Sequence, residues 1–162
     1  MIDERVHPRV LAALERLGAP YEILDCDDAF ADTEDFCRHY GRPLETSANT
    51  IVVSSKRGPK RRAACVLLAS TRLNVNTVVR REIGAPKVSF AGAEETLEVT
   101  GMELGGVTPF GLAPDIPLLI DAQVAGADRV IVGSGTRRSK IEIAPEALLL
   151  LPDARLVEDL AG

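Results

Sequence analysis

Residues 105–111 read Gly-Gly-Val-Thr-Pro-Phe-Gly, between an acidic segment with helical character and an apolar strand. Glycine permits a positive φ or a close approach to a ligand, and proline fixes φ and removes a hydrogen-bond donor. The backbone of such a loop is largely prescribed, and its N–H groups can converge on an oxygen atom. The stretch predicts a rigid loop with an exposed polar centre. A plainer interpretation is a tight connection that only turns the chain.

The composition limits the class of protein. The 162 residues fit a single domain, placed at residues 1–162, that is large enough to bury a core. No apolar run reaches the ~18 residues of a membrane span, and the N-terminus lacks the apolar run of a secretory signal, so a cytoplasmic protein is expected. The net charge of −5 argues against a protein that coats nucleic acid, but it permits a local patch that contacts phosphates.

Candidate ligands for a metal or cofactor are sparse. The three cysteines, Cys26, Cys37 and Cys65, are odd in number and have no CxxC spacing, so the sequence suggests neither a disulfide framework nor a zinc site. No Ser-His-Asp set and no metal-binding cluster can be recognised. We therefore expect no cofactor.

The order of the expected elements indicates a mixed α/β fold. Helical periodicity and capping residues predict helices near residues 5–17, 33–40, 74–83, 91–100 and 146–151. Alternating or apolar runs predict strands near residues 21–24, 49–53, 63–69, 86–90, 117–121, 128–132, 140–143 and 154–157. Asn74 is expected to cap the third helix. Because hairpins and α/β crossovers are mixed, we expect one curled, barrel-like mixed sheet surrounded by helices.

A basic hairpin connects the strands near residues 49–53 and 63–69. Its cations are Lys56, Arg57, Lys60, Arg61 and Arg62, around a Gly-Pro turn. One interpretation, which composition favours, is a solvated turn that protects a sheet edge from aggregation. The other is a finger that contacts phosphates.

The chain resembles the YbaK/EbsC family, which includes the editing domain inserted in bacterial prolyl-tRNA synthetases and its free-standing relatives. Residues 106–111 are similar to the Gly-x-Ser/Thr-Pro-x-Gly loop of that family. Further landmarks follow in family order at residues 49–53, 72–74, 87–90, 133–135 and 140–145. The resemblance runs from about Tyr21 to Leu151.

This resemblance implies an aminoacyl-tRNA deacylase with a barrel-like mixed sheet and helices around it. Such proteins hydrolyse the ester that joins a wrong amino acid to the 3′-terminal adenosine of tRNA, and the ribose 2′-hydroxyl is held to assist the water. The implied partners are a mischarged tRNA and an aminoacyl-tRNA synthetase, with no membrane. An activated ester needs positioning, a water molecule and an oxyanion site rather than a metal.

The resemblance also implies the residues of the site. The catalytic candidates are Asn49, Gly105, Gly106 and Thr108. The substrate-binding candidates are Thr50, Arg72, Pro109, Gly111, Gly133, Ser134 and Gly135. Backbone N–H groups of the glycines are expected to hold the oxyanion. For Ser134, a purely loop-forming role is an equal alternative.

One position departs from the family pattern. Many members carry a lysine just before the first core strand, where this chain has Asn49. An amide can donate a hydrogen bond but carries no charge, so the phosphate contact would pass to Arg72, Arg137 or Arg138. Three hypotheses follow: a free-standing trans-editing deacylase for a small amino acid, a binding module that lost hydrolysis, and an esterase that acts on small acylated molecules.

Overall fold

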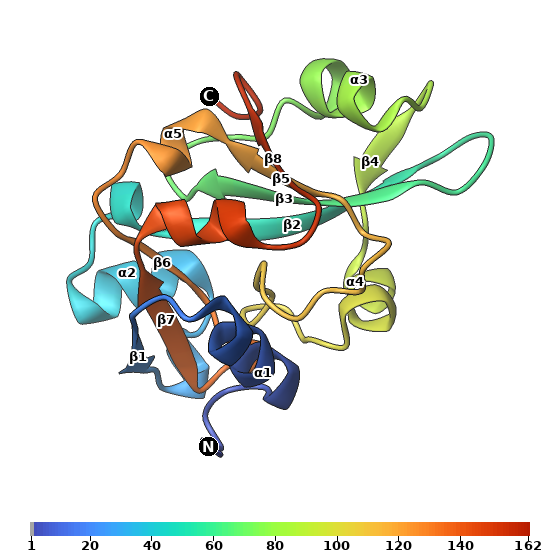
Figure 1. Cartoon of the computed structure of the whole chain (residues 1–162). Helices are drawn as coiled ribbons and strands as arrows, with labels where there is room; N and C mark the ends of the chain where they lie inside the picture. Colours follow the sequence, from blue (N-terminus) through green and yellow to red (C-terminus); the bar gives the residue numbers. More distant parts are fainter. Residues whose placement is uncertain (1) are drawn as a thin grey trace.

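The strands form two sheets rather than one. The computed structural model describes residues 2–162. A three-stranded antiparallel sheet has the order β1-β7-β6, and a five-stranded mixed sheet has the order β4-β2-β3-β5-β8 (Figure 1). The strands are β1 (Tyr21–Asp25), β2 (Ala48–Ser55), β3 (Arg62–Leu68), β4 (Val88–Phe90), β5 (Leu118–Asp121), β6 (Val130–Gly133), β7 (Ser139–Ile143) and β8 (Ala154–Val157). The mixed α/β expectation is confirmed. In place of the expected single curled sheet there are two sheets. An isolated β-bridge between Ser47 and Ile131 joins them.

The strand pairings define the two sheets. β2 pairs antiparallel with both β3 and β4, whereas β5 pairs parallel with both β3 and β8. β7 pairs antiparallel with β1 and β6 and completes the smaller sheet. The strands expected from alternation are therefore present, and the crossovers between them make the larger sheet mixed.

Helices and short turns cover both sheets. The α-helices are α1 (Pro8–Leu17), α2 (Thr33–Tyr40), α3 (Arg80–Ile83), α4 (Ala93–Thr100) and α5 (Ala122–Ala125). The 3₁₀ turns are η1 (Asp28–Phe30), η2 (Leu44–Thr46) and η4 (Pro145–Leu150), and η3 (Val75–Val79) is a π-helical turn. Among residues 2–162, no helix has the length and apolarity that a membrane crossing needs.

Local sequence signals set the helix bounds in most places. His7 caps α1 by accepting a hydrogen bond from Arg9 N, and Gly18 ends it with a φ of 72°. The helix expected over 74–83 differs, because it is split between η3 and α3. The Asn74 side chain donates to the carbonyl of Asp159 at 2.6 Å instead of capping the helix, so its expected capping role is wrong.

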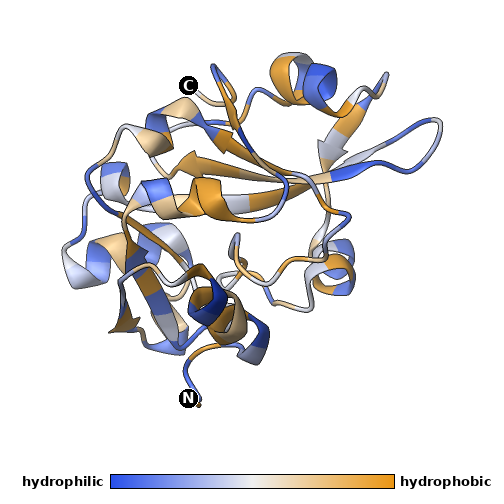
Figure 2. Cartoon of the chain, in the orientation of Figure 1, coloured by the Kyte–Doolittle hydropathy of each residue, from blue (hydrophilic) through white to orange (hydrophobic). Residues whose placement is uncertain are grey.

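The main core lies between the two sheets. Along β3, Ala64, Val66 and Leu68 point into this core, which α1, β6 and β7 complete. Ala63 and Cys65 point to the opposite face and pack with η3 and α3. This alternation follows from the two-residue period of a strand, and it leaves β3 buried on both faces. Figure 2 shows the apolar strands inside and a hydrophilic tip on the β2–β3 hairpin.

Candidate active site

The central loop, residues 101–117, connects α4 to β5 and contains three glycines in the left-handed region. Gly101 has a φ of 72°, Gly105 a φ of 88° and Gly111 a φ of 72°. A Cβ atom on Gly111 would also lie 3.1 Å from the backbone of Arg9. The side chain of Phe110 is fully buried in the main core and anchors the loop there. These positions tolerate no other residue without strain or a clash, and Phe110 fixes the loop to the core, while the predicted rigidity of the loop stays a prediction.

The centre of the loop is buried, whereas an exposed polar centre was expected. The side chain of Thr108 has no exposed surface, and its hydroxyl has no hydrogen-bond partner among residues 2–162. The hydroxyl of Thr50 on β2 is also buried and also has no hydrogen-bond partner within the described chain. The prediction of an exposed polar centre is wrong, because the buried side chain of Phe110 packs in the main core and the neighbouring Thr108 is buried with it. An unpaired buried hydroxyl is costly, so both threonines are candidate functional groups.

The central loop packs tightly against the loop that follows β6. A Cβ atom on Gly133 would lie 2.4 Å from the carbonyl oxygen of Val107, and one on Gly106 would lie 2.8 Å from that of Thr136. The N–H of Gly135 donates to the carbonyl of Gly106 at 2.7 Å. The two glycine loops expected to face each other are therefore in direct backbone contact.

A hydrogen bond within the central loop limits which of its backbone donors are free. The N–H of Gly106 donates to the carbonyl of Glu103 at 3.0 Å, so it is engaged in a turn and is not available to an oxyanion. Any oxyanion donor on this loop must therefore come from other amides or from the hydroxyl of Thr108.

Lys140 is a buried cation at the base of the central loop. Its ammonium donates to the carbonyls of Ala31, at 2.5 Å, and Gly105, at 3.0 Å, and it lies 5.6 Å from the ring centroid of Phe36. Desolvation lowers the pKa of Lys140 below its ordinary value of 10.5. The sequence does not reveal this residue, because Lys140 alternates with Ile141 along β7 like a solvent-facing side chain. The face of β7 that carries Lys140 is covered by α2.

Asn49 is linked to this cluster through Thr33 at the start of α2. The Thr33 hydroxyl donates to Oδ1 of Asn49 at 2.5 Å. Thr33, Gly133 and Lys140 line one small hollow between α2 and the two sheets. The sequence does not single out Thr33, which looks like an ordinary residue of a helix start. The candidate centre thus joins Asn49 and Thr33 on one side to Lys140 and Gly105 on the other.

The three arginines expected to take over the phosphate contact of the family lysine have different surroundings. Arg137 binds Asp28 and Asp32, both at 3.1 Å, and also donates to the carbonyl of Leu104 at 2.8 Å. Arg138 donates to the carbonyl of Glu4. Both side chains are engaged in holding loops together. Arg72, by contrast, lines a cavity of about 550 Å³ together with Asn49.

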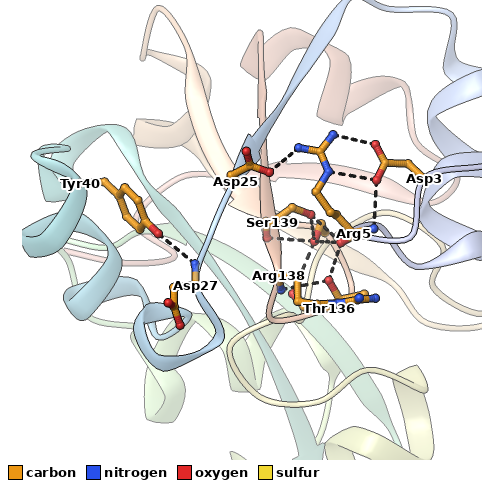
Figure 3. A network of polar contacts seen from close by, with 9 residues as sticks. Asp3, Arg5, Asp25, Asp27, Tyr40, Thr136, Arg138 and Ser139 are labelled. Carbon is orange, nitrogen blue, oxygen red and sulfur yellow. Dashed lines mark hydrogen bonds and ion pairs between the residues drawn. The ribbon is translucent and has the colours of Figure 1, made fainter.

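Ser134 faces the protein interior. Its hydroxyl lies 2.8 Å from the hydroxyl of Ser139 and donates to the carbonyl of that residue at 2.9 Å. Figure 3 shows the neighbouring network, in which Thr136 and Ser139 donate to the carbonyl of Arg5. Arg5 in turn pairs with Asp3, and its hydrogen bonds lower the pKa of Asp3 to about 2. These contacts fix the second glycine loop to the N-terminal segment.

The second half of the central loop borders a different cavity. Pro109 and Gly111 line a largely apolar space of about 430 Å³ between α1 and η4. Asn49 and Arg72 are not among its lining residues. The substrate residues expected in one pocket therefore border separate cavities, because Arg72 lines one of them and Pro109 and Gly111 line another.

The basic hairpin projects from the far end of β2 (Figure 1). Arg61 donates to the carbonyls of Ile83 and Gly84, both at 3.1 Å. Arg62 binds Glu95 at 2.7 Å, and Lys60 lies 3.9 Å from the same carboxylate. At about 3.3 Å per residue, β2 places the hairpin ~20 Å from Asn49. The cations at the exposed tip are Lys56 and Arg57.

Comparison with known proteins agrees with this architecture. The model of the aminoacyl-tRNA editing domain matches residues 27–151, which include the central loop, Lys140 and the hairpin. The chain belongs to this family. The YbaK/EbsC resemblance noted from the sequence is thereby confirmed.

Two known proteins are similar to this chain in sequence. An uncharacterised protein of Bacillus subtilis (strain 168), YwhH, is 31% identical over 112 residues, which cover 65% of this chain and 71% of that protein. A candidate Cys-tRNA(Pro)/Cys-tRNA(Cys) deacylase of Enterococcus faecalis (strain ATCC 700802 / V583), EbsC, is 27% identical over 108 residues, covering 67% of this chain and 63% of EbsC.

Solved structures of similar length share the fold of this editing-domain chain. Hypothetical protein APE2540 superposes with a TM-score of 0.84 and 25% identity over 95% of this chain and 99% of that one. A candidate trans-editing enzyme for prolyl-tRNA synthetase superposes with a TM-score of 0.80 and 23% identity over 98% of each chain. The second likeness supports the fold alone.

Proposed function

We propose that this protein is a free-standing trans-editing deacylase, which hydrolyses the ester of a mischarged small amino acid on tRNA. Membership of the editing-domain family supports tRNA deacylation in general. The observation that carries the proposal in this chain is the contact of Lys140 with the carbonyl of Gly105, at the point where two glycine loops meet. A rigid backbone held by a buried cation is suited to orient an ester without reorganisation.

The proposed reaction is a hydrolysis. A water oxygen attacks the ester carbonyl carbon, the bond from that carbon to the ribose oxygen breaks, and the released ribose oxygen takes up a proton. The products are the free amino acid and the tRNA. In this scheme Gly105, Gly106 and Thr108 belong to the loop that orients the ester, while Asn49 and Thr50 lie on the strand beside it. Pro109 and Gly111 determine the backbone conformation of the loop. Gly133, Ser134 and Gly135 belong to the loop after β6, which packs against it.

The proposed partner is a mischarged tRNA, and an aminoacyl-tRNA synthetase is a further proposed partner. The cytoplasm is the proposed place of action. The tip of the β2–β3 hairpin supports a contact with tRNA phosphates distant from the ester, because its cations lie ~20 Å along β2 from Asn49.

A second candidate is a binding module that has lost hydrolysis. It is favoured by Asn49, which carries an amide where many relatives have a lysine, and whose side-chain oxygen is held by Thr33. An amide brings no positive charge to the substrate.

A panel of mischarged tRNAs, together with the same amino acids as simple ethyl esters, tests these functions. The rate of ester hydrolysis is compared with the spontaneous rate for each compound. Acceleration with one or more tRNAs, and not with the ethyl esters, is expected for the deacylase. Binding without acceleration would support the module instead. Equal acceleration of both kinds of ester would show a general esterase and contradict the proposal.

A further inference from the structure

A polar cavity of about 320 Å³ lies at the base of the β2–β3 hairpin, which consists of residues 60–62. Its volume is within the range of small-ligand pockets. The residues that line it come from the hairpin base, α3, the end of the central loop and β8. Its charged members are Lys60, Arg61, Arg62, Glu82, Asp115 and Arg155. Four cations and two carboxylates border this space, so positive charge is in excess there.

The topology of the larger sheet explains why these segments meet. β3 pairs parallel with β5, and β5 pairs parallel with β8, so the three strands begin at one edge of the sheet. The hairpin base leads into β3, Pro117 precedes β5, and Arg155 is the second residue of β8. The N–H of Ala64 donates to the carbonyl of Pro117 at 2.9 Å, which fixes the end of the central loop against β3. Segments that are far apart in the sequence therefore border one cavity.

Arg61 is held in place and keeps free hydrogen-bond donors. Its Nη1 atom donates to the carbonyls of Ile83 and Gly84, both at 3.1 Å. Its Nε and Nη2 atoms have no hydrogen-bond partner among residues 2–162, and no carboxylate of these residues pairs with its guanidinium. A guanidinium that is fixed through one nitrogen and open at the others is suited to bind the oxygens of a phosphate.

Arg155 is a second cation of the cavity without a carboxylate partner. Its side chain is exposed and has no ion pair or hydrogen bond within the part of the chain that the structure describes. Arg62 and Lys60 differ, because they lie 2.7 and 3.9 Å from the carboxylate of Glu95. One exposed arginine is ordinary, but two unpaired guanidinium groups from distant segments border this cavity. A bound anion would be attracted to both.

The two carboxylates of the cavity oppose this attraction. Glu82 lies 3.8 Å from Arg81, so its charge is partly balanced. Asp115 is exposed and has no ion pair among the described residues 2–162, so it does not neutralise Arg61 or Arg155 by direct contact. Its charge lowers the affinity of the cavity for an anion, and its removal should therefore raise that affinity.

We propose that this cavity is a phosphate-binding site, in which Arg61 and Arg155 bind the oxygens of one phosphate group. The group belongs to a tRNA backbone or to a small phosphorylated ligand, and only the first source rests on the proposed function. Arg62 pairs with Ser54, five residues along β2 from Asn49, so the hairpin base is about 17 Å from Asn49. The site is therefore separate from the candidate active site.

Binding of inorganic phosphate tests the site without catalysis. Phosphate is titrated at constant ionic strength, and the backbone amide shifts of the cavity and of the hairpin tip are followed by NMR. Arg155→Gln should weaken phosphate binding by about 5- to 10-fold, because it removes a charged donor. Asp115→Asn should strengthen binding by about 2- to 5-fold, because it removes a like charge. Arg16→Gln, which removes an exposed arginine of α1 that also has no ion pair among residues 2–162, is the control and should bind as wild type does.

Unacylated tRNA identifies the source of the phosphate. If a tRNA phosphate occupies the cavity, Arg155→Gln should reduce the salt slope of log affinity for tRNA by ~0.9. An unchanged slope, together with weaker binding of inorganic phosphate, would identify a small phosphorylated ligand as the source. Both results support a phosphate site.

Three results would overturn the inference. They are the absence of saturable phosphate binding by wild type, an equal phosphate affinity of wild type, Arg155→Gln and Asp115→Asn, and amide shifts confined to the hairpin tip at Lys56 and Arg57. Each of them leaves the proposed hydrolysis standing. Conversely, phosphate binding that depends on Arg155 supports the inference even if no mischarged tRNA is hydrolysed.

Discussion

The ammonium of Lys140 on β7 donates to the carbonyl oxygen of Gly105 in the central loop at 3.0 Å. The same ammonium donates to the carbonyl of Ala31, just before α2. One buried cation therefore ties the smaller sheet to the central loop and to the segment that carries Thr33. A hydrogen bond from a charged donor in a dry site contributes more than a neutral one, so this interaction sets the position of the loop.

The first prediction concerns the pH dependence of hydrolysis. Burial lowers the pKa of Lys140 below 10.5, with Arg137 acting in the same direction and Asp32, Cys26 and Cys37 acting against it. Deprotonation removes the charge and one N–H, which weakens the hydrogen bond to Gly105, so the enzyme-dependent rate should fall as pH rises, at a pH below 10.5. The rate is measured from pH 6 to 10.5 and corrected for spontaneous ester hydrolysis.

A neighbouring thiol is the control for that pH profile. Cys26 is buried, and desolvation raises its pKa, so it also titrates at alkaline pH. Cys26→Ala should keep the alkaline decline. A decline that disappears in Cys26→Ala would assign it to the thiol and remove Lys140 from the account.

The second prediction concerns the pair of Thr33 and Asn49. Asn49→Ala removes the acceptor of the Thr33 hydroxyl, and Thr33→Val removes the donor, so each should lower kcat/KM by about 5- to 10-fold. The double variant should lose no more than either single one, since both remove the same hydrogen bond. Asn49→Lys should retain or improve turnover. Unchanged kinetics in both Asn49 variants would place this residue outside the site.

The third prediction concerns the unpaired hydroxyl of Thr108. Thr108→Val replaces it with a methyl group of similar size, so the free energy of unfolding should be unchanged or higher. If that hydroxyl holds the water or the oxyanion, the turnover of the same variant should fall about 10²-fold. Thr96→Val on α4 serves as the control, with wild-type turnover. A stable Thr108→Val protein with full activity would show that this hydroxyl takes no part in hydrolysis.

Much of the fold follows from local sequence signals. Gly18, Gly41 and Gly101 end helices in the left-handed conformation, as their positions after apolar periodic segments indicate. Strand alternation likewise gives every strand of both sheets to within a few residues. These features are local, and the physical rules that produce them act over a few residues.

The arrangement of the site depends on contacts between distant segments. Lys140 reads as a surface residue because nothing near it in sequence shows that α2 covers its side of β7. Thr33 and Asn49 are 16 residues apart and meet only in the folded chain. The sequence therefore indicates the glycine loops and Asn49, but it does not reveal the buried cation or the partner of Asn49.

The fourth prediction concerns the basic hairpin. Arg61 and Arg62 are tied to α3 and to Glu95, so the exposed tip cations Lys56 and Arg57 are the better pair to neutralise. The double variant Lys56→Ala/Arg57→Ala should raise KM for tRNA and reduce the salt slope of log affinity by ~0.7–0.9 for each phosphate that is no longer bound. Hydrolysis of a short aminoacyl-adenosine should hardly change, because it lacks the acceptor stem.

A cation elsewhere on the surface controls for net charge. Arg129→Ala removes an exposed arginine that pairs with Glu142, far from the hairpin in sequence. It should leave the salt slope as in wild type. An unaltered slope in the hairpin variant would identify the hairpin as a solubilising turn.

The most direct test of the account is the single-turnover rate of ester hydrolysis on a mischarged tRNA, with wild type compared to Lys140→Met and to Lys87→Met as the exposed control. Each protein is first shown to be folded by its thermal midpoint. We predict that wild type and Lys87→Met accelerate hydrolysis equally above the spontaneous rate. Lys140→Met should be slower by about 10- to 100-fold, the effect of losing the charged hydrogen bond to the carbonyl of Gly105. No acceleration by wild type on any mischarged tRNA, or full activity in folded Lys140→Met, would contradict the account.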